Sequence, residues 1–126
     1  MALYDILGKV SGVSLWKILG GYRDRIKTSV TVGILSEKET VEQSIEMIAQ
    51  GFRCLKLTGG FDVEGDISRV RKVREAVGKN IELRFDANQG YSVEASLRFV
   101  EETKKAHIAM LEQPTPKGEL DLLGRV

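Results

Sequence analysis

The fold is decided by residues 51–86, which read GFRCLKLTGGFDVEGDISRVRKVREAVGKNIELRFD. Two short runs in this stretch, Arg53 to Thr58 and Ile81 to Asp86, have the alternating apolar pattern of strands. Between them lies a predicted helix that ends at Gly78 and carries apolar residues at helical spacing: Ile67, Val70, Val73 and Val77. A strand, a helix and a second strand in this order indicate a βαβ unit with parallel strands.

The same alternation continues on both sides of this unit. The run Ile26 to Ile34 is rich in β-branched residues and predicts another strand. The run Ile108 to Glu112 predicts a fourth strand, which Pro114 and Pro116 end. Four strands separated by three amphipathic helices favour an α/β fold with a parallel sheet. Both an open Rossmann-like sheet and a partial (β/α)8 TIM-type barrel of about four βα units fit this pattern.

The other two helices between the strands have recognisable starts. Ser36 and Glu39 predict a capping box, and the helix behind them ends at Gly51 with an expected apolar face of Val41, Ile45 and Ile48. Ser92 is the predicted cap of the next helix, whose inward-facing residues are expected to be Val93, Leu97 and Val100.

Helical stretches are also predicted near both ends of the chain. Residues 2–10 carry apolar residues at helical spacing, and Leu15 to Leu19 forms a second short stretch before Gly20-Gly21. The opening of a fourth helix after the last strand is expected around Leu122 to Val126, which leaves the last layer of the fold unfinished.

Composition and charge exclude several classes of function. Of 126 residues, 19 are Lys or Arg and 18 are Asp or Glu, so the net charge is near zero and no basic stripe indicates nucleic-acid binding. No run is apolar and long enough to cross a bilayer and no signal peptide opens the chain, so a cytoplasmic protein is expected. Cys54 is the only cysteine and is interpreted as a buried strand thiol, and His107, the only histidine, is expected in a surface loop.

Charged residues recur at the predicted strand ends. Lys56, Asp86 and Glu112 are separated by roughly one βα unit each, so they are expected at equivalent positions on three strands. Active sites of α/β folds lie at this carboxyl edge, and hard carboxylate oxygens suit Mg²⁺. A satisfied ion pair between the lysine and a neighbouring carboxylate is the alternative interpretation.

Two other motif interpretations fail on the residues. The stretch Asp86 to Gly90 resembles the start of a calcium-binding EF-hand loop, but its glycine comes one place early and Leu97 holds the position of the closing glutamate. The pair Gly59-Gly60 lacks both the GxGxxG pattern and the lysine of a phosphate-binding loop, so no nucleotide site is predicted.

Several motifs together resemble the enolase superfamily, in its mandelate-racemase and muconate-lactonizing branch. The segment from Gly51 to Thr58 is similar to the segment that carries the KxK motif, Arg84 to Gly90 resembles RxDxNQG, and Leu111 to Pro114 resembles LEQP. Residues 5–9 and 15–21 resemble the link between a capping domain and the barrel. The resemblance covers nearly the whole chain and identifies it as the first half of such a barrel.

The resemblance implies a role for each matching position. Asp86 and Glu112 would be Mg²⁺ ligands, Asn88 would lie beside the metal and the substrate carboxylate, and Lys56 would help to hold that carboxylate. Members of the family abstract the proton α to a carboxylate and use the metal to stabilise the resulting enediolate. Thr58 stands where the family has the second lysine of KxK, the usual base, and a hydroxyl cannot accept a proton as an amine does.

The resemblance also implies that parts of the parent enzyme lie outside this sequence. The third acidic ligand, the opposing base and the capping domain have no counterpart here, so residues 1–25 are expected to be linker helices and 26–126 the N-terminal half of the barrel. We expect the chain alone to be inactive, as a fragment or as a natural half-barrel. Because a half-barrel leaves strand edges unpaired, the alternative function is an oligomeric scaffold, and a homo-oligomer is the expected partner state.

Overall fold

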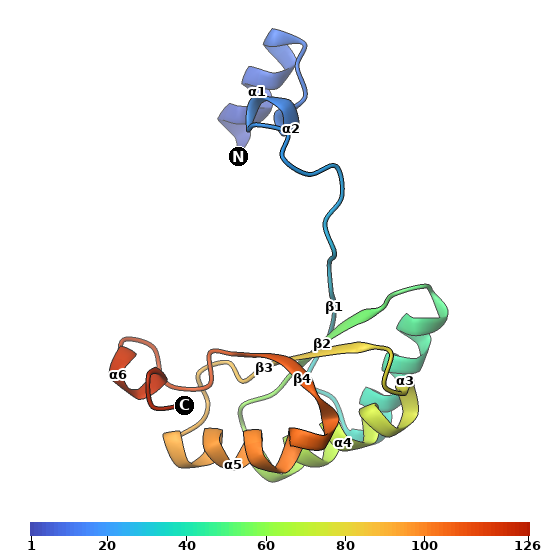
Figure 1. Ribbon diagram of the computed structural model, residues 1–126, viewed down its shortest axis with the longest axis vertical. Helices are drawn as coiled ribbons and strands as arrows, with labels where there is room; N and C mark the ends of the chain where they lie inside the picture. The colour runs from blue at the N-terminus through green and yellow to red at the C-terminus, as the bar shows by residue number, and fades with distance from the viewer.

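The computed structural model describes residues 1–126 as one parallel sheet with helices along one of its faces (Figure 1). The strands are β1 (Val30–Val32), β2 (Cys54–Thr58), β3 (Glu82–Asp86) and β4 (Ile108–Glu112). The helices are α1 (Ala2–Ser11), α2 (Leu15–Ile18), α3 (Glu37–Ala49), α4 (Val63–Val77), α5 (Val93–Thr103), the 3-10 helix η1 (Lys104–Ala106) and α6 (Leu120–Leu123).

Strand order separates the two folds that the sequence left open. The sheet runs β1-β2-β3-β4 with every neighbouring pair parallel, so the order never reverses. The helices α3, α4 and α5 all cover the same face, and the other face is open (Figure 1). A doubly wound sheet has helices on both faces and a reversal of strand order, whereas a barrel has neither. The partial TIM-type barrel is therefore confirmed.

The core lies between the sheet and these helices. The strand side chains that point to this face are buried, and they are Leu55, Leu57, Leu83 and Phe85. The predicted stripe on α4 packs onto them: Ile67, Val70 and Val73 are buried and Val77 is partly buried. Phe85 also contacts Phe99 of α5, with ring centroids 4.5 Å apart. The alternation of apolar residues along the strands thus predicted the inner layer correctly.

Helix α5 is rotated relative to the prediction. Leu97 and Val100 were expected to face inward but are 47% and 45% exposed, and the buried residues are Val93, Ser96, Phe99 and Thr103. The rotation follows from Phe99, the largest side chain of the helix, which packs against the ring of Phe85. Thr103 can be buried because its hydroxyl donates to the carbonyl of Phe99 at 2.7 Å.

Helix α3 differs from its prediction for a similar reason. The capping box of Ser36 and Glu39 is confirmed, but Ile45 is 50% exposed. Thr40 and Ser44 occupy the buried face instead, and each hydroxyl donates to a carbonyl one turn back, at 2.8 and 2.7 Å. These bonds remove the cost of burying a hydroxyl, so small polar residues are tolerated on the buried face of α3.

The first strand is shorter than predicted. Only Val30–Val32 pairs with β2, from Leu55 to Leu57, although Ile26 to Ile34 was expected to be a strand. Ile26 is 81% exposed because the segment before Val30 extends beyond the start of β2.

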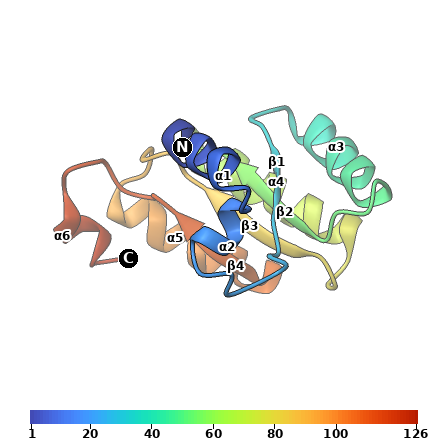
Figure 2. The same cartoon turned by 90° about the horizontal axis from the view of Figure 1, so that it is seen from above.

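Helices α1 and α2 stand apart from the sheet at the end of an extended segment (Figure 1), and from above they lie over its open face (Figure 2). The predicted helices at 2–10 and Leu15 to Leu19 are present within a residue. Four apolar residues of α1 are half or more exposed: Leu3, Ile6, Leu7 and Val10. None of the helices has the length and apolar character needed to cross a membrane.

Candidate metal centre

Three charged side chains predicted from the sequence meet at the carboxyl edge of the sheet. The ammonium of Lys56 lies 2.8 Å from Oδ2 of Asp86 and 2.9 Å from Oε2 of Glu112. These contacts hold both carboxylates around the ammonium group of Lys56. They raise the pKa of Lys56, chiefly through its hydrogen bonds to Asp86 and then Glu112, so the lysine remains protonated.

The register of the strands explains how these residues meet. Asp86 and Glu112 are paired across β3 and β4, whereas the residue paired with Asp86 on β2 is Thr58. Lys56 was expected at the position on β2 that is equivalent to Asp86 and Glu112. This prediction is wrong, because Lys56 lies two residues earlier on its strand. Lys56 pairs with Arg84, and its ammonium reaches the carboxylates because the lysine side chain is long enough to span one step of the strand.

The backbone after β3 has an unusual conformation. Asn88 and Gln89 have φ angles of 46° and 64°, and Gln113 after β4 has a φ of 42°. Left-handed backbone at non-glycine residues is uncommon and concentrates at functional sites. It turns the amide of Asn88 towards Oδ1 of Asp86, which it meets at 3.0 Å, so one oxygen of this carboxylate is fixed by the local chain.

Asn88 lies in the loop after β3, two residues beyond Asp86. Its side chain is exposed, and its Nδ2 donates to the carbonyl of Gly59 at 3.3 Å. The loop after β2 and the loop after β3 are therefore connected directly by this side chain.

The only cysteine, Cys54, and the only histidine, His107, lie away from this centre. Cys54 is buried at the start of β2, and burial together with Glu82 raises the pKa of its thiol. His107 is exposed after η1, as predicted.

The donor set fits a hard divalent cation in part. Two carboxylates at adjacent strand ends suit Mg²⁺, which takes few protein ligands and keeps several waters. No group of three or more acidic, histidine or cysteine side chains is gathered anywhere in the chain. The ion-pair alternative from the sequence is what the structure shows, since Lys56 bridges the two carboxylates, and metal binding by the same carboxylates stays a prediction.

Sequence reasoning missed a second group of polar residues at this edge. Asp66 of α4 is buried and accepts hydrogen bonds from the amide of Gly60, at 2.8 Å, and from the hydroxyl of Tyr91. It also pairs with Arg69. The available signal was that Asp66 and Arg69 interrupt the apolar stripe of α4, where unpaired charge would be costly.

Comparison with known proteins shows the family of the chain. Residues 39–126 match the family model described as enolase C-terminal domain-like. The chain belongs to this family. It falls in the branch of the enolase superfamily that includes muconate lactonizing enzymes, as the sequence motifs predicted.

Several relatives of this family member are named as epimerases, and another is an arabinonate dehydratase of Saccharolobus solfataricus. The L-Ala-D/L-Glu epimerase of Bacillus subtilis is 36% identical over 129 residues, which is 100% of this chain and 35% of the relative. The hydrophobic dipeptide epimerase of Enterococcus faecalis is 34% identical over 121 residues, 96% of this chain and 34% of the relative. The chain thus spans about a third of the length of these relatives.

Solved structures show the same fold. The substrate-liganded L-Ala-D/L-Glu epimerase of Bacillus subtilis matches with a TM-score of 0.94 and 35% sequence identity. The match covers 99% of this chain and 36% of the epimerase chain. The dipeptide epimerase of Methylococcus capsulatus complexed with Mg matches with a TM-score of 0.93 and 36% sequence identity. The match covers 100% of this chain and 36% of the epimerase chain. The cofactor predicted from the sequence, Mg²⁺, is therefore the ion bound by a close structural relative.

Proposed function

We propose that this chain carries part of the active site of a Mg²⁺-dependent enzyme that abstracts the proton α to a carboxylate, of the racemase, epimerase, cycloisomerase or dehydratase type. The observation that supports this proposal is the convergence of Asp86 and Glu112, from paired positions on β3 and β4, on one ammonium group. Residues 26–126 are the part of the barrel that holds this site, and residues 1–25 are helices that link it to a capping domain.

Each residue has a defined part in the proposed chemistry. Asp86 and Glu112 would hold Mg²⁺, and the bound ion would supply positive charge to stabilise the anion formed when the α-proton leaves. Lys56 is protonated and therefore acts as a donor that orients the substrate carboxylate. Asn88 is exposed in the loop after β3, and its amide would donate a second hydrogen bond to the same carboxylate.

Thr58 limits what this chain does alone. It lies opposite Asp86 in the sheet, at the position where the family has a lysine base. Its hydroxyl has no basic lone pair comparable with an amine, so this position does not supply the proton acceptor. We therefore propose that the chain by itself is inactive and that a complete site requires further protein.

The substrate is a small molecule with a carboxylate. Because the relatives of known function include several dipeptide epimerases, a dipeptide is the first substrate to test.

A calorimetric titration of the purified chain with Mg²⁺ tests the metal site. We expect saturable binding with one ion per site, and loss of that binding in Asp86→Ala, because one of the two carboxylates is removed. Glu42→Ala is the control, since Glu42 is an exposed carboxylate on α3 that pairs only with Lys38. Unchanged binding in Asp86→Ala would contradict the proposal.

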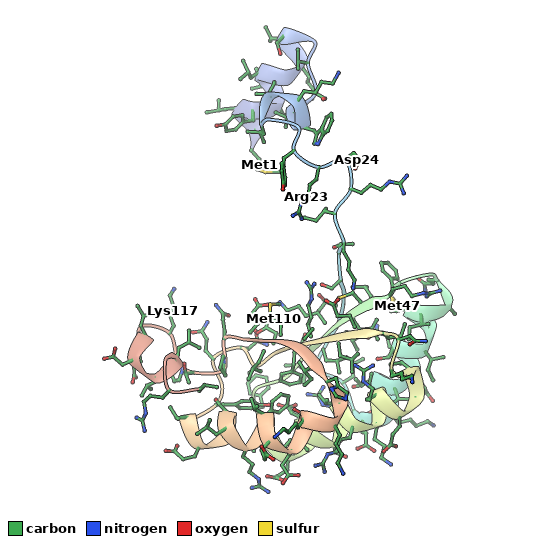
Figure 3. The ribbon with its side chains drawn as sticks, viewed as in Figure 1. Met1, Arg23, Asp24, Met47, Met110 and Lys117 are labelled. Carbon is green, nitrogen blue, oxygen red and sulfur yellow. The ribbon has the colours of Figure 1, made fainter.

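The second candidate function is an oligomeric scaffold, and the exposed edge of the sheet favours it. Met110 is 42% exposed on β4, on the face of the sheet away from the helices (Figure 3), and Val100 of α5 is exposed beside this edge. An apolar strand edge of this kind pairs readily with another strand. Absence of Mg²⁺ binding together with a stable oligomer would favour the scaffold over the enzyme.

A further inference from the structure

A buried carboxylate on α4 is surrounded by hydrogen-bond donors that come from other elements. Asp66 is 3% exposed. It accepts from the amide of Gly60 in the loop after β2 and from the hydroxyl of Tyr91 in the loop after β3. Its charge is balanced by Arg69, one turn further along the same helix. Asp66 therefore joins two loops to the helix between them.

The partners of Asp66 extend this connection to a third loop. Arg69 donates to the carbonyl of Thr58 at 3.1 Å, at the end of β2. The amide of Tyr91 donates to the carbonyl of Pro114 at 2.9 Å, in the loop after β4. Burial, reinforced by the hydrogen bond to Asp66, raises the pKa of Tyr91, so its hydroxyl stays protonated and remains a donor.

The same three loops carry the candidate metal centre. The amide of Gly59 donates to the backbone carbonyl of Asp86, and the amide of Ala87 donates to that of Glu112, at 2.9 and 3.0 Å. The loops also touch closely, because a β-carbon added to Gly60 would lie 2.0 Å from the carbonyl oxygen of Ala87. A displacement of the Gly60 loop is therefore passed to the backbone that holds both carboxylates.

We propose that Asp66 and Tyr91 are positioning residues, which fix the spacing of Asp86 and Glu112 by fastening the three loops to α4. This inference rests on the proposed function of the two carboxylates as metal ligands. No hydrogen bond joins Asp66 or Tyr91 to either carboxylate, so the effect acts through the backbone of the loops.

The variant Tyr91→Phe tests the proposal with the smallest change, because it removes one hydroxyl and keeps the ring against Phe99. Tyr22→Phe is the chemically matched control, since Tyr22 is 88% exposed and follows α2, which stands apart from the sheet (Figure 1). Val70→Ala is the control for a general loss of stability, because Val70 is a buried core residue of the same helix. Asp66→Asn is the second test variant, and it is expected to have a larger effect than Tyr91→Phe.

Two measurements are made on each full-length variant. Amide hydrogen exchange, followed by NMR, reports opening of the loops at Gly59, Gly60 and Asn88 without any metal. We expect exchange at these amides to speed up by about tenfold or more in Tyr91→Phe, the size expected for loss of a hydrogen bond to a charged group. We also expect Mg²⁺ affinity to fall by about tenfold, as is usual when a residue supporting a metal ligand is removed.

The outcomes separate this inference from the proposed function. If the wild-type chain binds no Mg²⁺ but the loops open selectively in Tyr91→Phe, the metal site is wrong and the positioning role of Tyr91 stands. The exchange rates of the three amides are compared between Tyr91→Phe and Val70→Ala at an equal loss of stability. If they rise no more in Tyr91→Phe than in Val70→Ala, the positioning role is refuted. Unchanged Mg²⁺ affinity in both Tyr91→Phe and Asp66→Asn would also overturn it.

Discussion

Lys56 is the residue whose removal has the most informative expected effect. In Lys56→Met the carboxylates of Asp86 and Glu112 lose their shared cation, and we expect the free energy of unfolding to fall by about 2 kcal/mol, the range for hydrogen bonds between charged groups. Mg²⁺ affinity should rise by about tenfold, because one unit of positive charge is removed from beside a divalent cation at a partly exposed site.

Chemical denaturation with and without Mg²⁺, together with calorimetry, measures both effects of Lys56→Met. Lys38→Met is the control, because Lys38 forms only an exposed pair within α3. Weaker Mg²⁺ binding in Lys56→Met than in the control would show that the lysine supports the metal rather than competing with it.

Glu82 gives the chain a predictable response to acid. Hydrogen bonds from Lys27, and then from Arg84 and Cys54, lower the pKa of Glu82 from 4.5 to about 2. Since the folded pKa lies below the unfolded one, the ionised carboxylate stabilises the fold. This contribution is complete above pH 4.5 and is lost as the pH falls from there towards 2.

Thermal unfolding of wild type and Glu82→Gln across pH 2 to 6 checks this expectation. The difference in stability between the two proteins should be largest at pH 6 and shrink as the pH falls. A difference that stays constant with pH would contradict the role of the ionised carboxylate.

At the scale of elements, the loops after β2 and β3 approach each other closely at Gly60. Gly60 has a φ of 112° and lies so close to Ala87 that no side chain fits. We therefore expect Gly60→Ala to destabilise the chain by about 3 kcal/mol or more, from backbone strain and a steric clash combined. Denaturant unfolding measures the loss.

Gly33→Ala is the matched control for this substitution, because an added β-carbon at Gly33 meets nothing within 4 Å. It should change stability by less than about 1 kcal/mol. Equal losses in the two variants would show that the close contact between the loops does not exist.

The elements were largely predictable because their signals are local. Alternating residues gave the strands, and Ser36, Ser92 and Gly78 marked helix ends that the structure confirms. The rotation of α5 was not predictable, since it depends on Phe99 meeting Phe85 from another element. The spacing of Lys56, Asp86 and Glu112 along the chain predicted that they lie at one edge of the sheet. The hydrogen bond from Tyr91 to Asp66 joins residues 25 apart on different elements, so no local sequence pattern predicts it.

At the scale of the whole molecule, the half-barrel has an open edge at β4. A shallow apolar pocket lies beside it, lined in part by Phe99, Val100, Ile108 and Leu111. We expect the purified chain to self-associate through this edge, because pairing satisfies the free backbone groups and covers the apolar residues.

Light scattering at increasing concentration measures this association, with a dimer as the expected species. Val100→Glu should shift the chain towards monomer, since it places a charge beside the edge. Val10→Glu is the control, because Val10 is an exposed apolar residue on α1, away from the sheet. A monomer at all concentrations would contradict the prediction.

Strands β3 and β4 bring Asp86 and Glu112 together, and we propose that the two carboxylates share one metal ion. A crystal structure of the chain grown with Mn²⁺, with anomalous diffraction recorded for the metal, tests this site. We predict an anomalous peak within coordination distance of both carboxylates, with the ammonium of Lys56 displaced from between them. Lys56 still bridging the two carboxylates, with no peak beside them, would contradict the proposed metal site.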